Sequence, residues 1–337
     1  MKNNYKLLPT EDIRITKDST TIGVFDKLNN TYTKTEIDRN FYTKTETDET
    51  VSEINGAISD CNDDITAISE TLAVLDRIIF PEKYYLVLQA ITNTAFHFYY
   101  NNLNGELYYS VDDGKTWNIF DSQEPTETIV PGQKILIRGN IVPIGGGGGT
   151  STNGCGTIES TGQFKAYGNV MAIMYDITPT TVNHYTPVAG AFARLFENCT
   201  GLVDAGELII PSTISDSCCQ EMFKGCTSLE NAPALPATEM EPYCYYQMFL
   251  GCTSLETAPD LPGDNLKTYS YFEMFKNCSS LNYVKALLTT PTVGNNWYTN
   301  MLTGVASNGT FVKKTDTPWV AGDGLVPSGW TVVDATA

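Results

Sequence analysis

The stretch MFKGCTSLENAPALP at residues 222–236 returns twenty-six residues later as MFLGCTSLETAPDLP at residues 248–262. Related segments begin at residue 195 (LFENCTGL), residue 274 (MFKNCSSL) and residue 301 (MLTGVAS), so the five starts are 27, 26, 26 and 27 residues apart. A fixed period of this length indicates stacked units, because one such unit cannot bury an apolar face alone. We therefore expect residues 157–337 to form a repeat domain in which Met, Phe, Leu and Cys side chains line up in columns.

Each repeat has two parts with different local preferences. We expect Met222 and Phe223 to begin a short helical turn, whereas proline pairs such as Pro233 with Pro236 hold the return leg extended. The segments MFKGCTSLENAPALP and MFLGCTSLETAPDLP resemble the leucine-rich-repeat-like repeats of the BspA type, which occur in surface proteins of gut Bacteroides and in phages that infect them. GVASNGTFVKK and GDGLVPSGWTVV resemble the C-terminal cap of those domains. The resemblance covers about half of the chain and implies a leucine-rich-repeat-like solenoid.

A second regular pattern occupies residues 51–80. Its apolar residues alternate at spacings of three and four: Val51, Ile54, Ile58, Cys61, Ile65, Ile68, Leu72, Leu75 and Ile79. Such heptads are typical of a coiled coil, and isoleucine at both core positions favours three parallel strands over two. The alternative, one amphipathic helix packed on a globular core, usually has a wider apolar face. We predict that this segment is the trimer core of an N-terminal coiled-coil stalk.

The segments before residue 51 are polar. Residues 1–30 contain only a few apolar anchors, at Tyr5, Leu7, Leu8, Ile13 and Ile15. Residues 31–50 repeat YTKTEID as YTKTETD, and each copy has the Thr-x-x-Glu spacing of a capping box, so two helix starts are expected there. This echo before a heptad segment is similar to stalk segments of phage fibre proteins.

The middle of the chain has the composition of strands. Residues 82–143 contain short runs rich in Val, Ile, Tyr and Phe, separated by turn signals, and predict a small β-sandwich domain. Residues 144–156, beginning GGGGG, predict a flexible linker. The fold class predicted for the whole chain is therefore mixed α and β, with a trimeric coiled-coil stalk, a small β-sandwich and a C-terminal solenoid.

The totals exclude several functions. The net charge of −18, from 39 acidic and 21 basic residues, argues against a nucleic-acid partner. No run reaches the roughly 18 apolar residues of a membrane span, and the first residues lack the apolar core of a signal peptide, so we expect neither membrane insertion nor secretion. The nine cysteines lack C-x-x-C spacing and the chain has two histidines, His97 and His184, so we expect buried free thiols, no metal site and no cofactor.

One segment matches an enzyme motif. Ser110, Asp112, Gly114, Thr116 and Trp117 fit the Asp box of sialidases, S-x-D-x-G-x-T-W. A sialidase would need several copies and an arginine triad, but only two arginines follow residue 81. We interpret the motif as a structural turn and predict no catalytic residues and no enzymatic activity.

The aromatic residues of the array are the candidate ligand contacts. They cluster just before the repeated Met-Phe pairs: Tyr243, Tyr245, Tyr246, Tyr269, Tyr271 and Trp297. Part of this set must lie in the core, so core packing and ligand contact remain open for each of them.

The order of segments and the two resemblances predict a homotrimeric phage fibre. In this interpretation residues 1–30 attach the chain to capsid or tail proteins of the virion, as a head fibre or a tail fibre. The repeats are then presented on the virion surface for attachment to a host glycan or protein, after assembly in the host cytoplasm. The alternative is a bacterial cell-surface adhesin with BspA-like repeats.

Overall fold

The computed structural model describes residues 44–79, 83–99, 103–120, 124–143, 154–175, 186–263, 265–288 and 296–336. Contacts divide the chain into two compact units, residues 1–69 and residues 70–337. The anchors predicted for virion attachment, Tyr5, Leu7, Leu8, Ile13 and Ile15, lie outside the described residues.

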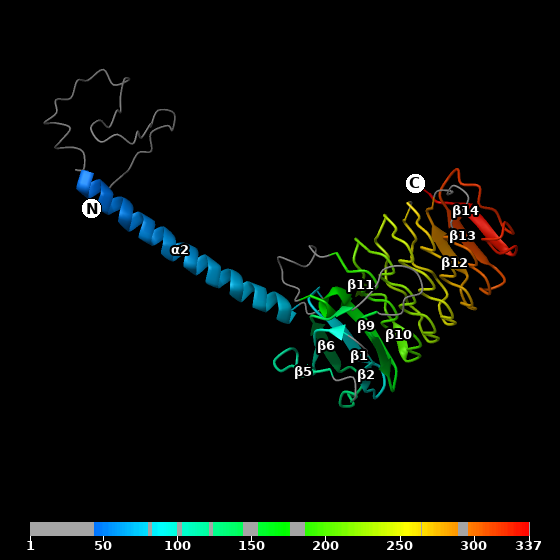
Figure 1. The fold of residues 1–337 in the computed structure, drawn as a ribbon, viewed down its shortest axis with the longest axis horizontal. Helices are drawn as coiled ribbons and strands as arrows, with labels where there is room; N and C mark the ends of the chain where they lie inside the picture. The colour runs from blue at the N-terminus through cyan, green and yellow to red at the C-terminus, as the bar shows by residue number, and fades with distance from the viewer. Residues whose placement is uncertain are drawn as a thin grey trace, which may run out of the picture. The chain divides into compact units, whose positions relative to one another are not determined.

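One α-helix, α2 (Lys44–Ile79), contains the heptad segment (Figure 1). The described apolar side chains of its stripe are 50–63 % exposed, from Val51 to Leu72, and Cys61 is also exposed. Leu75 and Ile79 belong to the helix, but their side chains are outside the described set. Among the described residues no second helix packs on α2, so the predicted trimeric coiled-coil stalk is wrong as a description of this fold. The heptad spacing defines an apolar stripe on one helix and does not by itself supply a partner.

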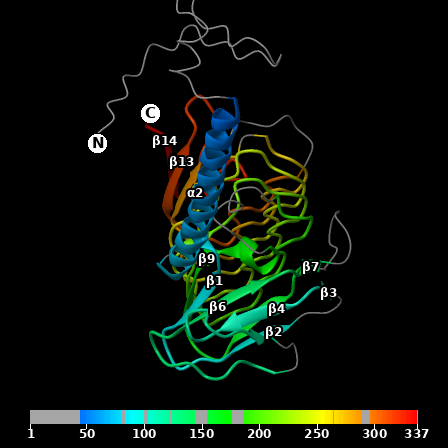
Figure 2. The same cartoon turned by 90° about the vertical axis from the view of Figure 1, so that its left-hand side faces the viewer.

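The strands of the middle segment form one mixed sheet rather than a sandwich. Seven strands take part: β1 (Leu86–Ala90), β4 (Leu107–Ser110), β5 (Asn118–Ile119), β6 (Lys134–Gly139), β9 (Phe164–Asn169), β10 (Leu202–Asp204) and β11 (Leu208–Ile209). The order is β10-β9-β1-β6-β4-β5, and β11 also pairs with β9. Figure 2 labels β9, β1, β6 and β4 of this sheet. Pairs from β9 to β5 are antiparallel, whereas β10 and β11 run parallel to β9.

Two short sheets and a 3₁₀ helix complete this region. The sheets pair β2 (Phe96–Tyr99) with β8 (Thr157–Ser160), and β3 (Leu103–Asn104) with β7 (Val142–Pro143). The helix η2 (Val170–Ile173) is buried, and the Asn169 side chain accepts a hydrogen bond from the Met171 amide at its start. The prediction of a separate β-sandwich is wrong because β8 and β9, which follow the glycine-rich segment, pair with strands that precede it.

The repeats form stacked rungs of consecutive turns. We define the turn array by five nine-residue rungs: 190–198, 217–225, 243–251, 269–277 and 296–304. In every rung the first, fifth and ninth residues have positive φ, for example Tyr243, Gln247 and Gly251 in the third. Alternate amides bond within the rung, as Met248 N does to Tyr245 O at 3.2 Å. The amides between them bond to the next rung, as Phe249 N does to Met274 O at 2.9 Å.

This geometry corrects two expectations. The Met-Phe segments are not helical, because a left-handed residue at every fourth position interrupts α-helical bonding and half of the amides donate to the next rung. The predicted leucine-rich-repeat-like solenoid is also wrong. Such repeats place a strand in every unit, whereas here regular strands occur beside β9 and in one parallel sheet of β12 (Tyr283–Ala286), β13 (Gly309–Lys313) and β14 (Trp330–Asp334).

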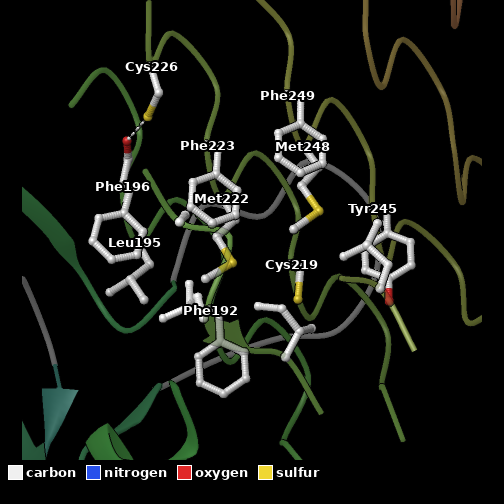
Figure 3. Packing of buried hydrophobic residues seen from close by; sticks show 14 of the residues in the cluster. Phe192, Leu195, Phe196, Cys219, Met222, Phe223, Cys226, Tyr245, Met248 and Phe249 are labelled. Atoms are coloured by element: carbon white, nitrogen blue, oxygen red, sulfur yellow. Dashed lines mark hydrogen bonds between the residues drawn. The ribbon is translucent and has the colours of Figure 1, made fainter. Parts of the chain in front are cut away.

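The predicted columns of apolar side chains are confirmed. Phe196, Phe223, Phe249 and Phe275 are buried and stack nearly parallel, with ring centroids 5.5, 5.3 and 5.6 Å apart. Figure 3 shows the first three of these rings. Of the nine cysteines, all free, eight are buried as expected and Cys61 is not. Three of the buried thiols donate to a phenylalanine carbonyl of the preceding rung, such as Cys252 Sγ to Phe223 O at 3.1 Å. Burial raises the pKa of the Cys252 thiol well above its usual value, so the donor proton is retained.

Candidate functional site on the turn array

The structure separates the six candidate contact residues into two groups. Tyr243, Tyr246 and Tyr269 are half-buried at the surface, whereas Tyr245 and Tyr271 are completely buried and Trp297 is 5 % exposed. The division follows position within the rung: in the third and fourth rungs the first and fourth residues are half-buried and the second and third are buried, and Trp297 is the second residue of the fifth rung. Tyr245 and Tyr271 stack on each other inside, with centroids 5.9 Å apart. The core interpretation therefore holds for these two and for Trp297.

The surface tyrosines form a continuous cluster with one residue that the sequence prediction missed. We call Tyr243, Tyr246, Tyr269 and Phe272 the aromatic patch. Tyr243 stacks on Tyr269 at 5.0 Å, and Tyr246 stacks on Phe272 at 5.3 Å. The two columns meet edge to face, since Tyr269 lies 5.1 Å from Phe272 at an angle of 79°. Phe272 could have been found from the repeat, because it stands 26 residues after Tyr246.

Two tyrosines of the patch occupy left-handed backbone positions. Tyr243 and Tyr269 have φ of 55° and 57° as the first residues of their rungs. An L-residue other than glycine or asparagine is disfavoured there by roughly 1–2 kcal/mol. The same position is held by Gly190, Ser217 and Asn296 in the other rungs, so the fold does not require an aromatic side chain there. Strained aromatic residues in a surface cluster point to a role in contact.

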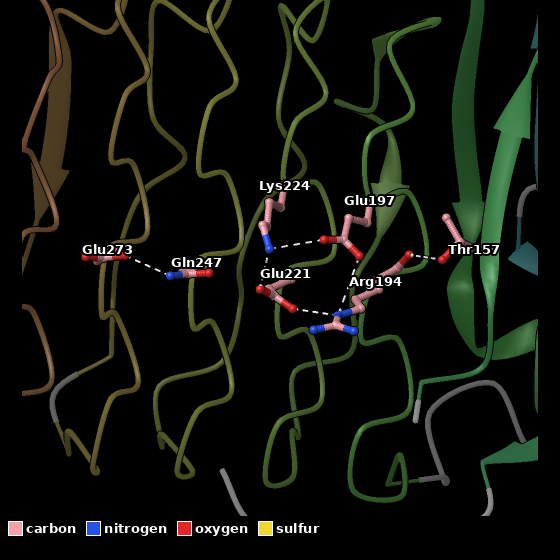
Figure 4. Close-up of polar contacts among 7 residues, drawn as sticks. All are labelled: Thr157, Arg194, Glu197, Glu221, Lys224, Gln247 and Glu273. Carbon is pink, nitrogen blue, oxygen red and sulfur yellow. Dashed lines mark hydrogen bonds and ion pairs between the residues drawn. The ribbon is translucent and has the colours of Figure 1, made fainter. Parts of the chain in front are cut away.

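A row of charged and amide side chains runs along the same rungs, from the fifth and eighth positions (Figure 4). In the first two rungs, Glu221 accepts hydrogen bonds from Arg194 Nε and from Lys224 Nζ, each at 2.6 Å. Lys224 also contacts Glu197 at 3.1 Å. Burial alone would raise the pKa of Glu221, but the bonds and charges of Lys224 and Arg194 outweigh burial and lower that pKa.

The second acidic group lies in the rungs that carry the patch. Glu273 accepts hydrogen bonds from Gln247 Nε2 at 2.7 Å, Lys276 Nζ at 2.7 Å and Asn300 Nδ2 at 3.2 Å. Burial works to raise the pKa of Glu273, and these three partners together lower it. Glu221 and Glu273 are thus ionised and accept hydrogen bonds from two and three donors, respectively. Glu197, the third carboxylate of the row, contacts Lys224, so each of the three already has a basic partner.

The Asp-box segment is a closed turn. The Asp112 carboxylate accepts from Thr116 N at 2.9 Å, from Thr116 Oγ1 at 2.7 Å and from Ser110 Oγ at 2.7 Å. Trp117 Nε1 donates to Gly114 O at 3.0 Å, and the Arg138 guanidinium lies 4.3 Å from the Trp117 ring. The polar groups of the motif form hydrogen bonds with one another within the turn, which agrees with the interpretation as a structural turn.

The described residues also bear on metal sites and on membrane spans. They contain no group of three or more His, Cys, Asp or Glu side chains arranged to hold a metal ion. In the same part of the chain, no helix has the length and apolarity needed to cross a membrane. Comparisons with protein-family models, curated proteins and solved structures find no match. The site is accordingly interpreted from its own chemistry, which offers ring surfaces, hydroxyls and amides for contact.

Proposed function

We propose that this chain is a structural attachment protein without enzymatic activity: a homotrimeric fibre of a phage particle that presents the turn array to the host cell surface. The observation that carries the proposal is the aromatic patch. Two of its three tyrosines, Tyr243 and Tyr269, stand at left-handed positions that neighbouring rungs fill with glycine, serine or asparagine, so their presence is explained by contact with a partner rather than by folding. The resemblance to BspA-type surface repeats supports the same class of function.

Self-association is supported by the charge distribution on α2. Its apolar side chains are exposed along one stripe. Over residues 55–71 six residues flank this stripe in the heptad. Asp64 is charged, and the other five are uncharged: Asn55, Ala57, Asn62, Ser69 and Thr71. The acidic side chains Glu53, Asp60, Asp63 and Glu70 fall on the rest of the helix surface. The exposed side chains of this stripe are therefore available for contact with other copies of the chain, and the proposal assigns no coiled-coil arrangement to that contact.

Three copies would strengthen attachment through multivalency. If each array binds weakly, linking three of them can raise the apparent affinity by roughly 10²–10⁴-fold when the sites can be reached together. In this proposal residues 1–30 dock on a head or tail protein of the virion, and the host surface is the partner of the array.

Attachment is tested with labelled full-length protein added to a panel of gut Bacteroides strains. The proposal expects saturable attachment to at least one strain and detection of the chain by mass spectrometry in purified phage particles. A folded protein that attaches to no strain would contradict the attachment function. Attachment together with recovery of the chain only from the bacterial surface fraction would replace the phage fibre by the adhesin.

Self-association is tested by light scattering of the full-length chain. We expect the mass of three copies, and a mass close to one copy for the double variant Ile65→Asp with Ile68→Asp. Ser59→Asp with Thr66→Asp adds the same charge away from the stripe and should leave the mass unchanged. A single-copy mass for the unmodified chain would refute the homotrimer.

A further inference from the structure

The aromatic patch has a chemistry that selects among the ligands of an attachment protein. We propose that it binds an uncharged, linear carbohydrate chain that lies along the turn array, across the rungs that contain Tyr243 and Tyr269. The inference rests on the attachment function proposed above and specifies its ligand class. A protein ligand is the competing outcome.

The first argument is charge. The chain has a net charge of −18, which disfavours acidic ligands such as nucleic acid or acidic polysaccharide. A cationic ligand would need an open carboxylate beside the rings, but Glu221 and Glu273 already accept hydrogen bonds from basic and amide side chains. Asp216 also lies near the patch, since its charge acts with burial to raise the pKa of Tyr243, and its carboxylate accepts a hydrogen bond from Ser217 Oγ at 2.6 Å. The remaining neutral hydrogen-bonding groups beside the rings suit an uncharged ligand.

The second argument is the chemical mixture at the surface. Tyrosine combines an apolar ring with a polar hydroxyl, and three of the four patch residues are tyrosines. At the end of the patch, the exposed Asn296 holds its amide 3.4 Å from the Tyr269 hydroxyl. A sugar ring has the complementary mixture, with an apolar C–H face for the aromatic rings and hydroxyls for amide and phenol groups.

The third argument is spacing. Neighbouring rings of the two columns are 5.0 and 5.3 Å apart along the array. Side chains on one face of an extended peptide recur about every 6.6 Å, twice the rise of a strand residue, so a peptide soon loses register with the rungs. A pyranose ring with its bridging oxygen is similar in length to this ring spacing. One sugar unit can therefore follow each rung.

The array itself supplies the substitutions for a test. Ser217 and Asn296 hold the same left-handed position as the two tyrosines, in the rungs on either side. The double variant Tyr243→Ser with Tyr269→Asn therefore uses residues that this fold already accommodates. Tyr283→Thr is the matched control, because Thr257 precedes Tyr283 by one repeat and bridges to it on the return leg, away from the patch.

The experiment measures attachment of the full-length protein to the Bacteroides strains that bind it. Cells are treated with periodate, which cleaves the vicinal diols of sugars, or with a protease, and neutral polysaccharide purified from the same strain is added as competitor. We expect periodate and the competitor to abolish attachment and protease to leave it. The double variant should bind the purified polysaccharide about tenfold to a hundredfold more weakly, the range for two lost aromatic contacts, and Tyr283→Thr should bind normally.

The opposite outcomes are distinguishable. Attachment that is lost to protease but resists periodate would overturn the carbohydrate ligand and leave the attachment function in place. Periodate-sensitive attachment that is equally strong in the double variant and the unmodified protein would remove the patch from the interaction. No attachment to any strain by a folded protein would overturn both proposals.

Discussion

The left-handed positions of the rungs can be tested at Gly251, the ninth residue of the third rung. Its φ is +76°, and a Cβ added there would have Gly225 Cα as its nearest heavy-atom neighbour, at 3.9 Å. Gly251→Ala therefore adds backbone strain without a steric clash. The strain of a left-handed L-residue is roughly 1–2 kcal/mol, and the smaller entropy of alanine in the unfolded chain offsets about 0.4–1 kcal/mol of it. We expect a net destabilisation of about 1 kcal/mol.

Two further variants separate strain from steric effects. Gly225 has the same φ, +75°, but a Cβ there would lie 2.3 Å from Asn198 Oδ1, so Gly225→Ala should be more destabilising than Gly251→Ala. Asn198 and Asn277 already occupy the ninth position of other rungs with positive φ. Asparagine tolerates this conformation better than alanine, so Gly251→Asn should lose less stability than Gly251→Ala.

The assay is urea unfolding of the purified variants, followed by tryptophan fluorescence and analysed as differences in the free energy of unfolding. The expected order of stability is Gly251→Asn, then Gly251→Ala, then Gly225→Ala. A Gly251→Ala protein as stable as the unmodified chain would refute the left-handed conformation of this position. It would also weaken the strain argument for Tyr243 and Tyr269, which depends on the same backbone geometry.

Two other predictions concern the core and the Asp-box turn. Phe249 stacks on a phenylalanine on each side, at 5.3 and 5.6 Å, whereas among the described residues Phe275 stacks only on Phe249. Phe249→Leu should therefore lower the free energy of unfolding by about 0.5–1.5 kcal/mol more than Phe275→Leu in the same urea assay, the value of one aromatic pair. Equal losses would contradict the stacked column. Hydrogen bonds from the Thr116 amide and hydroxyl and from Ser110 lower the pKa of Asp112 from 3.8 to about 2. Because the folded-state pKa is depressed, the stabilisation by this carboxylate is complete above pH 3.8 and is lost as the pH falls toward about 2. Asp112→Asn should reduce the acid dependence of stability in that window, and identical pH profiles for the two proteins would argue against the hydrogen-bonded turn.

Local patterns in the sequence predicted the features that depend on local chemistry. The period of 26–27 residues located the rungs, and the repeated Met-Phe and Cys positions located the columns of the core. The Asp-box residues act on one another within eight positions, so their turn was also readable from the sequence. Three of the six candidate aromatic contacts, Tyr243, Tyr246 and Tyr269, do lie at the surface.

The errors came from interactions between distant segments. Met-Phe segments resemble helix starts by composition, but every second amide bonds to the next rung, as Phe223 N does to Met248 O, and this pairing selects consecutive turns instead. Residues 82–143 have the composition of a separate β-sandwich, yet β1 of that segment pairs with β9, which lies beyond the glycine-rich segment, so strands from both sides share one sheet. The heptads of α2 describe a stripe correctly but do not establish what packs on it, and in the structure those side chains are exposed.

The sequence by itself determined the period of the array, the apolar columns and the acidic charge, because each of these is a property of residue order and composition. Only the tertiary structure decided the direction of each aromatic side chain. Tyr245 and Tyr246 are neighbours in the chain, yet one is buried and the other lies in the patch. Their directions depend on backbone angles that are set by hydrogen bonds between rungs, and such bonds exist only when the repeats are stacked.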